Sequence, residues 1–151
     1  YKNDFILILA GYNQEMVEFL RSNPGLKSRF PLHIDFPDYS LEELLAIGDL
    51  MYKNREYRLN NTAREALKQS ICRLCMENPN NHGNARTVRN IVEGSLRMQA
   101  VRLLDHSLIS EDLSKGELEE INSSDVKETV MKISKKNKTK NEFQPYINAV
   151  E

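Results

Sequence analysis

The chain has 151 residues, of which 40% are hydrophobic and 28% are charged, and its formal net charge is −1. This composition indicates an ordinary soluble chain with one modest core and excludes fibrous or collagen-like structure. The nearly neutral charge gives no field that would by itself recruit nucleic acid or an anionic membrane. No apolar run approaches the roughly 18 residues of a membrane-spanning helix. We therefore expect a cytoplasmic protein.

The first predicted element is a strand from Phe5 to Ala10 within the run DFILILAGY. Its unbroken β-favouring apolar residues are typical of a strand buried on both faces of a parallel sheet. The same run is too short for a secretory signal and has no basic segment before it. Because the chain begins on Tyr1 rather than methionine, we expect it to be a piece of a longer protein.

A helix is predicted for Asn13 to Ser22, followed by a turn at Pro24 and Gly25. The stretch LHIDF, residues 32–36, then alternates apolar and polar residues as a second short strand would, and Pro37 ends it. Residues 1–38 are therefore predicted to be an α/β fragment. Arg29 lies between the turn and this strand.

The pattern changes to helical periodicity at Ser40. The sequence SLEE is a capping box, in which Ser40 and Glu43 satisfy each other's backbone N–H groups. A second helix is predicted from Asn61 or Thr62 to the sequence ENPNNHG, and a third from Asn84 to about Leu104. These helices predict a helical bundle over residues 39–133.

A short strand, a last helix and a polar tail are predicted for the end of the chain. The sequence ELEEI suggests a short strand, and Ser124 to Ile133 suggest a last helix. Residues 134–151 lose all periodicity and are expected to be a polar, flexible tail. Its lysines are interpreted as a solvated end rather than a grip on nucleic acid.

The two cysteines, Cys72 and Cys75, have the C-x-x-C spacing of a redox pair or half a metal site. They fall in the middle of a predicted helix, and no second C-x-x-C or histidine pair completes a four-ligand set. Small buried side chains are the favoured interpretation, and no metal site is predicted.

Three polar residues are candidates for function, and each has a simpler alternative. Arg29 in a polar turn is most often a solvated surface charge. Arg86 falls in the first turn of a predicted helix, where a cation opposes the helix dipole unless an anion binds it. Asn13 alone is most simply a helix N-cap or turn residue.

Three blocks resemble AAA+ ATPases, in the branch that contains red-type rubisco activases and stage V sporulation protein K. ILAGYNQEM resembles the sensor-1 strand and helix, NPGLKSRFPLHIDFPDYSLEEL the arginine-finger turn and last strand, and GNARTVRNIVE the start of the sensor-2 helix. The resemblance covers roughly residues 4–104. It implies the end of the large AAA+ P-loop NTPase subdomain followed by its helical lid.

The resemblance also implies roles for individual residues. Arg29 would be the arginine finger that acts on the neighbouring subunit's nucleotide, and Asn13 would position the attacking water as sensor 1. Arg86 would contact the phosphates of ATP bound to its own subunit as sensor 2, and Gly83 and Asn84 would bind the same nucleotide. A planar, permanently charged guanidinium suits phosphate because it donates two parallel hydrogen bonds.

For the full-length protein, the resemblance implies ATP and Mg²⁺ as cofactors. It also implies a homo-oligomer, which we expect to be a hexamer, and an unidentified protein substrate. No G-x-x-x-x-G-K-[ST] loop and no acidic magnesium-binding strand occur in this sequence, so we expect the chain alone to be inactive as an ATPase. The alternative is a non-catalytic helical module that binds protein or nucleic acid.

The family topology further implies a missing strand between the two predicted strands. If both strands form, they should then lie roughly 9 to 10 Å apart, with an empty slot between them. Direct pairing of the two strands, filling of the slot by another chain, or poor order of the first segment are the alternatives.

Overall fold

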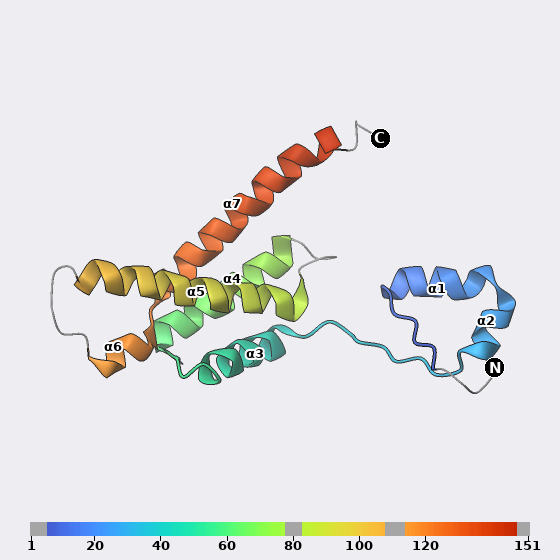
Figure 1. Cartoon of the computed structure of the whole chain (residues 1–151), viewed down its shortest axis with the longest axis horizontal. Coiled ribbons are helices and arrows are strands. Elements are labelled where there is room, and N and C mark those ends of the chain that lie inside the picture. Colours follow the sequence, from blue (N-terminus) through green and yellow to red (C-terminus); the bar gives the residue numbers. More distant parts are fainter. Residues whose placement is uncertain (1–5, 78–82, 108–113, 148–151) are drawn as a thin grey trace. The chain divides into compact units, whose positions relative to one another are not determined.

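The computed structural model describes residues 6–77, 83–107 and 114–147 (Figure 1). The chain divides into two compact units, Tyr1–Pro37 and Asp38–Glu151. Each unit is described separately below, beginning with the smaller one.

The described residues of unit 1 form the helices α1 (Asn13–Ser22) and α2 (Pro24–Arg29). The predicted bounds of the first helix are confirmed. The predicted turn at Pro24 and Gly25 is wrong, because these residues form the first turn of α2. The Asn23 side chain accepts a hydrogen bond of 3.0 Å from the Gly25 N–H, and Pro24 has no N–H that needs a partner at this position.

The two strands predicted in unit 1 are wrong for the residues that the structure describes. Residues 6–10 and 32–36 have no regular secondary structure, and among the described residues only two short strands occur, both in unit 2. A strand is stable only when a neighbour pairs with its N–H and C=O groups, and no described residue pairs in this way with either segment. Neither the expected gap between two strands nor a direct ladder is therefore present. Ile6, Ile34 and Phe36 are exposed.

Unit 2 is a bundle of helices with one small parallel sheet. The helices are α3 (Leu41–Lys53), α4 (Asn61–Glu77), α5 (Asn84–Ser107), α6 (Lys115–Glu119) and α7 (Ser123–Ile147). The sheet pairs β1 (Arg58–Leu59) with β2 (Glu120–Ile121), with Arg58 opposite Glu120.

The starts of α3, α4 and α5 agree closely with the sequence patterns. The capping box of α3 is present: the Ser40 N–H donates to Glu43 Oε2 at 2.8 Å, and the Glu43 N–H donates to Ser40 Oγ at 3.2 Å. The Asn60 side chain caps α4 by accepting from the Ala63 N–H at 2.8 Å. Each cap satisfies a backbone N–H that has no partner inside its helix.

The end of unit 2 differs from the sequence prediction in two ways. The segment ELEEI is a strand only at Glu120 and Ile121, because its first residues complete α6. Helix α7 continues to Ile147, beyond its predicted end at Ile133, so the backbone of residues 134–147 is helical rather than irregular. Lysine and glutamate are good helix formers, so low apolar periodicity did not prevent a helix.

The core of unit 2 lies where α3, α4, α5 and α7 pack together (Figure 1). Its side chains are almost all aliphatic, and each contributes roughly 1.5 to 3 kcal/mol when fully buried. The most deeply buried are Leu44, Tyr52, Leu67, Ile71, Val88, Ile91, Val92, Ile121 and Val126.

Buried polar groups in this core are paired. Arg102 donates from Nε and Nη2 to the two carboxylate oxygens of Asp125, both at 3.0 Å, and thereby ties α5 to α7. Asp125 is 2% exposed and also accepts the Asn122 N–H. The Tyr52 hydroxyl lies 2.5 Å from Ser95 Oγ, and burial raises the pKa of Tyr52 to about 12.

Candidate functional site

The first turn of α5 carries three of the residues singled out in the sequence, Gly83, Asn84 and Arg86. Gly83 has a φ of +72° and Asn84 a φ of +50°, so two consecutive residues adopt left-handed backbone conformations. A Cβ at position 83 would lie 2.7 Å from Thr87 Oγ1, so only glycine fits there. The Gly83 carbonyl accepts the Arg86 N–H at 2.9 Å and thereby closes the turn.

Arg86 projects its charge at the N-terminal end of a 24-residue helix. Its side chain is exposed, and it forms no ion pair or side-chain hydrogen bond with any described residue. The first turn of α5 holds no acidic residue. Because a cation opposes the positive end of the helix dipole, an anionic ligand would stabilise this arrangement.

The side chain of Asn84, unlike that of Arg86, forms hydrogen bonds with described residues. Its Nδ2 donates to Asp38 Oδ1 at 2.8 Å, and its Oδ1 accepts the Tyr39 N–H at 3.3 Å. Both polar atoms of the amide are therefore used within unit 2, on the two residues with which this unit begins. Sequence patterns could not predict this contact, because the two partners of Asn84 lie 45 and 46 positions away.

Asn13 and Arg29 lie in unit 1. Asn13 is the first residue of α1 after the N-cap Tyr12, so it is not itself the cap. Arg29 is the last residue of α2, where a cation is favourable to the helix dipole. Both side chains are exposed, and neither forms a hydrogen bond or ion pair with another described residue.

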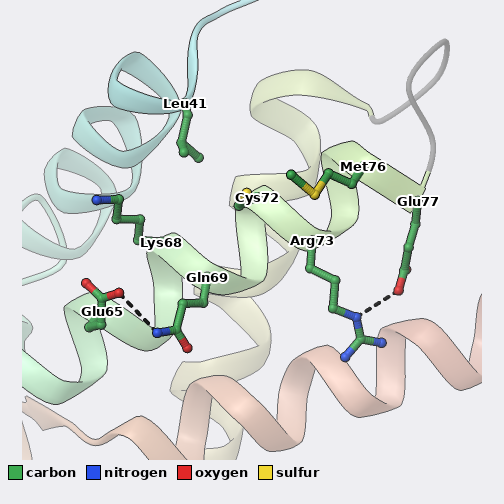
Figure 2. A pocket seen from close by; sticks show the side chains of 8 residues that line it. All are labelled: Leu41, Glu65, Lys68, Gln69, Cys72, Arg73, Met76 and Glu77. Atoms are coloured by element: carbon green, nitrogen blue, oxygen red, sulfur yellow. Dashed lines mark hydrogen bonds and ion pairs between the residues drawn. The ribbon is translucent and has the colours of Figure 1, made fainter.

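A groove of about 480 Å³ lies along α4, opposite the start of α3 (Figure 2). Glu65 accepts a hydrogen bond from Gln69, and Arg73 pairs with Glu77 and also donates to Ser134 on α7. None of the predicted site residues lines it. The lining residues are Leu41, Glu65, Lys68, Gln69, Cys72, Arg73, Met76 and Glu77. The sequence did not reveal the groove, because Leu41 reaches it from a different helix.

Cys72 lines this groove, and Cys75 lies one helical turn further along α4. Both thiols are free and half-buried. Burial raises the pKa of Cys75, which favours the neutral thiol over the reactive thiolate. In the described parts of the chain, no three His, Cys, Asp or Glu side chains come together as a metal site requires. Among the same residues, no helix is long and apolar enough to cross a membrane.

Residues 40–139 match the family described as the AAA lid domain. The chain belongs to this family. The match begins at the capping box of α3 and extends into α7, so the lid domain coincides closely with the bundle of unit 2. The predicted fold class, the end of an AAA+ module followed by a helical lid, is confirmed at this level.

Several curated proteins resemble the chain over most of its length. Stage V sporulation protein K of Bacillus subtilis is 44% identical over 126 residues, which cover 83% of this chain and 38% of that protein. A CfxQ homolog of Galdieria sulphuraria is 42% identical over 123 residues, covering 80% and 40%. The chloroplastic ribulose bisphosphate carboxylase/oxygenase activase of Cyanidioschyzon merolae is 38% identical over 125 residues, covering 83% and 41%.

The chain therefore spans less than half of the length of these relatives. These proteins also confirm the resemblance drawn from the three sequence blocks, since a sporulation protein K and a rubisco activase are both among them.

Proposed function

We propose that this lid domain and the segment before it belong to an AAA+ ATPase that couples ATP hydrolysis to the remodelling of a protein partner. The similarity to stage V sporulation protein K and to a rubisco activase supports this proposal. The full-length protein would act as a homo-oligomer, which we propose to be a hexamer. In such a protein, the lid would change position with the bound nucleotide, and this movement would act on the protein substrate.

Arg86 is the observation that carries the proposal. It is an exposed guanidinium at the N-terminal end of α5, within the lid domain, and it has no partner among the residues that the structure describes. A triphosphate bound to the same subunit would supply the anion that this position favours, and the guanidinium can donate two hydrogen bonds to it. In this role Arg86 binds the phosphates of ATP before hydrolysis, so that its contact depends on whether nucleotide is bound.

Arg29 is proposed to act on the neighbouring subunit's nucleotide. Charge builds on the equatorial oxygens of the transferred phosphoryl group, and a guanidinium placed there lowers the barrier. Its exposed position at the end of α2, without a partner among the described residues, leaves it available for such a contact. Asn13 is proposed to orient the attacking water through its exposed amide.

ATP and Mg²⁺ are the proposed cofactors of the full-length protein. The charge and exposure of Arg86 fit the phosphates of ATP. No group of three or more His, Cys, Asp or Glu side chains that could hold a metal ion by itself occurs among the described residues. When bound, Mg²⁺ neutralises charge on the β- and γ-phosphates.

Equilibrium binding of a fluorescent ATP analogue to the full-length protein tests the role of Arg86. Because a hydrogen bond to a charged group contributes about 1.5 to 3 kcal/mol, Arg86→Ala should weaken binding by roughly 10- to 100-fold. Arg97→Ala is the matched control, since it removes another exposed arginine of α5. Equal affinities of Arg86→Ala and the wild type would contradict the proposed role.

A further inference from the structure

Hydrogen bonds of the Asn84 side chain join the first turn of α5 to the first residues of unit 2. Asp38 is the first residue of unit 2 and follows Pro37, the last residue of unit 1. Its carboxylate accepts the Asn84 amide at 2.8 Å. The point at which the chain enters the lid is therefore attached to the first turn of α5.

The backbone conformation of Asn84 is restricted by its own positive φ and by that of Gly83. Its φ of +50° lies in the left-handed region, which asparagine tolerates better than most residues. Gly83 precedes it with a φ of +72° and has no room for a side chain. The backbone of this turn is thus narrowly defined, and the amide of Asn84 points from it to Asp38 and Tyr39.

Arg86 lies two residues further along in the same turn, with its N–H bonded to the Gly83 carbonyl at 2.9 Å. On the other side, Asp38 and Tyr39 lead directly into Ser40, the cap of α3. Arg86 and Asn84 therefore belong to one backbone turn, and the Asn84 side chain joins that turn by hydrogen bonds to the first two residues of unit 2.

We propose that Asp38 and Asn84 form a latch that holds the connecting segment against the first turn of α5 and so transmits nucleotide contact at Arg86 to the junction of the two units. This inference rests on the proposed ATPase function. It assigns Asn84 a positioning role in place of the direct nucleotide contact that family resemblance implied. Loss of the latch would lower the rate of ATP hydrolysis, whereas loss of Arg86 would lower the affinity for nucleotide.

Two substitutions remove the latch from opposite ends. Asn84→Gly deletes the amide while keeping a residue that accepts the positive φ, and Asp38→Ala deletes the acceptor. If the latch is the shared unit, each variant and the double variant should lower kcat of the full-length ATPase by a similar factor, about 5- to 10-fold, because effects within one unit are not additive. Nucleotide affinity should remain within about 3-fold of wild type.

Amide hydrogen exchange gives a second readout that does not depend on activity. The Tyr39 N–H donates to Asn84, so its exchange should accelerate in Asn84→Gly while the amides of the α5 core stay protected. Asp105→Ala, which removes an exposed acid at the far end of α5, is the control and should change neither kcat nor this exchange.

Distinct results would overturn the latch and the proposed function. If Asn84→Gly weakens nucleotide binding and Asp38→Ala does not, Asn84 is a nucleotide-contact residue and the latch is wrong. If Arg86→Ala behaves as proposed but both latch variants keep wild-type kcat, the latch alone fails. If the wild-type protein does not hydrolyse ATP, the proposed function fails, and the latch's role in turnover fails with it.

Discussion

A close approach of α5 to α7 at Gly94 allows the packing of the lid domain to be tested by adding one methyl group. Gly94 lies in α5 and faces Thr129 of α7, which is 4% exposed. A Cβ at position 94 would overlap Thr129 Cγ2 and would lie 3.1 Å from its Oγ1 and 3.3 Å from its Cβ. The Thr129 hydroxyl donates to the Asp125 carbonyl at 2.8 Å, so the side chain cannot turn away without losing that bond.

Two opposing effects determine the result of Gly94→Ala. Replacing glycine by alanine inside a helix is favourable by about 1 kcal/mol. Inserting a methyl group into a packed interface costs roughly 1 to 3 kcal/mol. Because the clash at Thr129 involves a branched, hydrogen-bonded side chain, we expect the upper part of that range and a net loss of about 1 to 2 kcal/mol.

Urea unfolding followed by circular dichroism measures this change, and the midpoint should fall by roughly 0.5 to 1 M. Gly116→Ala is the matched control, because a Cβ there would meet only Ser114 Oγ at 3.9 Å, and it should leave the midpoint unchanged or raise it. Thr129→Ser removes the obstructing methyl group and keeps the hydroxyl, so Gly94→Ala should cost less in that background. A Gly94→Ala chain as stable as the wild type would refute the close packing of α5 on α7.

The remaining predictions concern a buried tyrosine and the proposed finger. Burial raises the folded-state pKa of Tyr52 to about 12 from an ordinary value of 10.0, so its stabilising contribution should be fully present below pH 10 and should be lost as pH rises from about 10 to 12. Thermal unfolding across that range checks this, and Tyr52→Phe should have a shallower decline; equal declines would contradict it. Arg29→Ala in the full-length protein should leave ATP affinity within a few-fold and lower turnover by about 10³-fold or more, since a finger acts in the transition state. Mixing Arg29→Ala subunits with subunits that bind ATP but have a defective site of their own should restore part of the activity, and a complete lack of rescue would show that Arg29 does not act in trans.

Local sequence patterns determined most of the lid domain. The capping box at Ser40 and the starts of α4 and α5 were all predicted, because caps and helical periodicity depend on residues a few positions apart. The exposed start of α5 with Arg86 followed from the same patterns. The predicted AAA+ relationship was also carried by short contiguous blocks, and the match over residues 40–139 confirms it.

Strands could not be predicted from local sequence, because a strand forms only where a distant segment of the chain pairs with it. The apolar run at residues 6–10 has the composition of a strand, yet strand formation depends on neighbouring backbone rather than on composition, and no neighbour pairs with it among the described residues. Conversely, β1 has only two residues and is a strand because Glu120 and Ile121 lie beside it.

The sequence thus determined where α3, α4 and α5 begin and that Arg86 is exposed in the first turn of α5, because these features arise within one or two turns of chain. Only the tertiary structure decided what the polar side chains contact. The structure joins the Asn84 amide to Asp38 and Tyr39, and it likewise joins Arg102 to the buried Asp125. Hydrogen bonds of this kind form between groups that packing brings together, and the packing is set by the complementary shapes of whole helices.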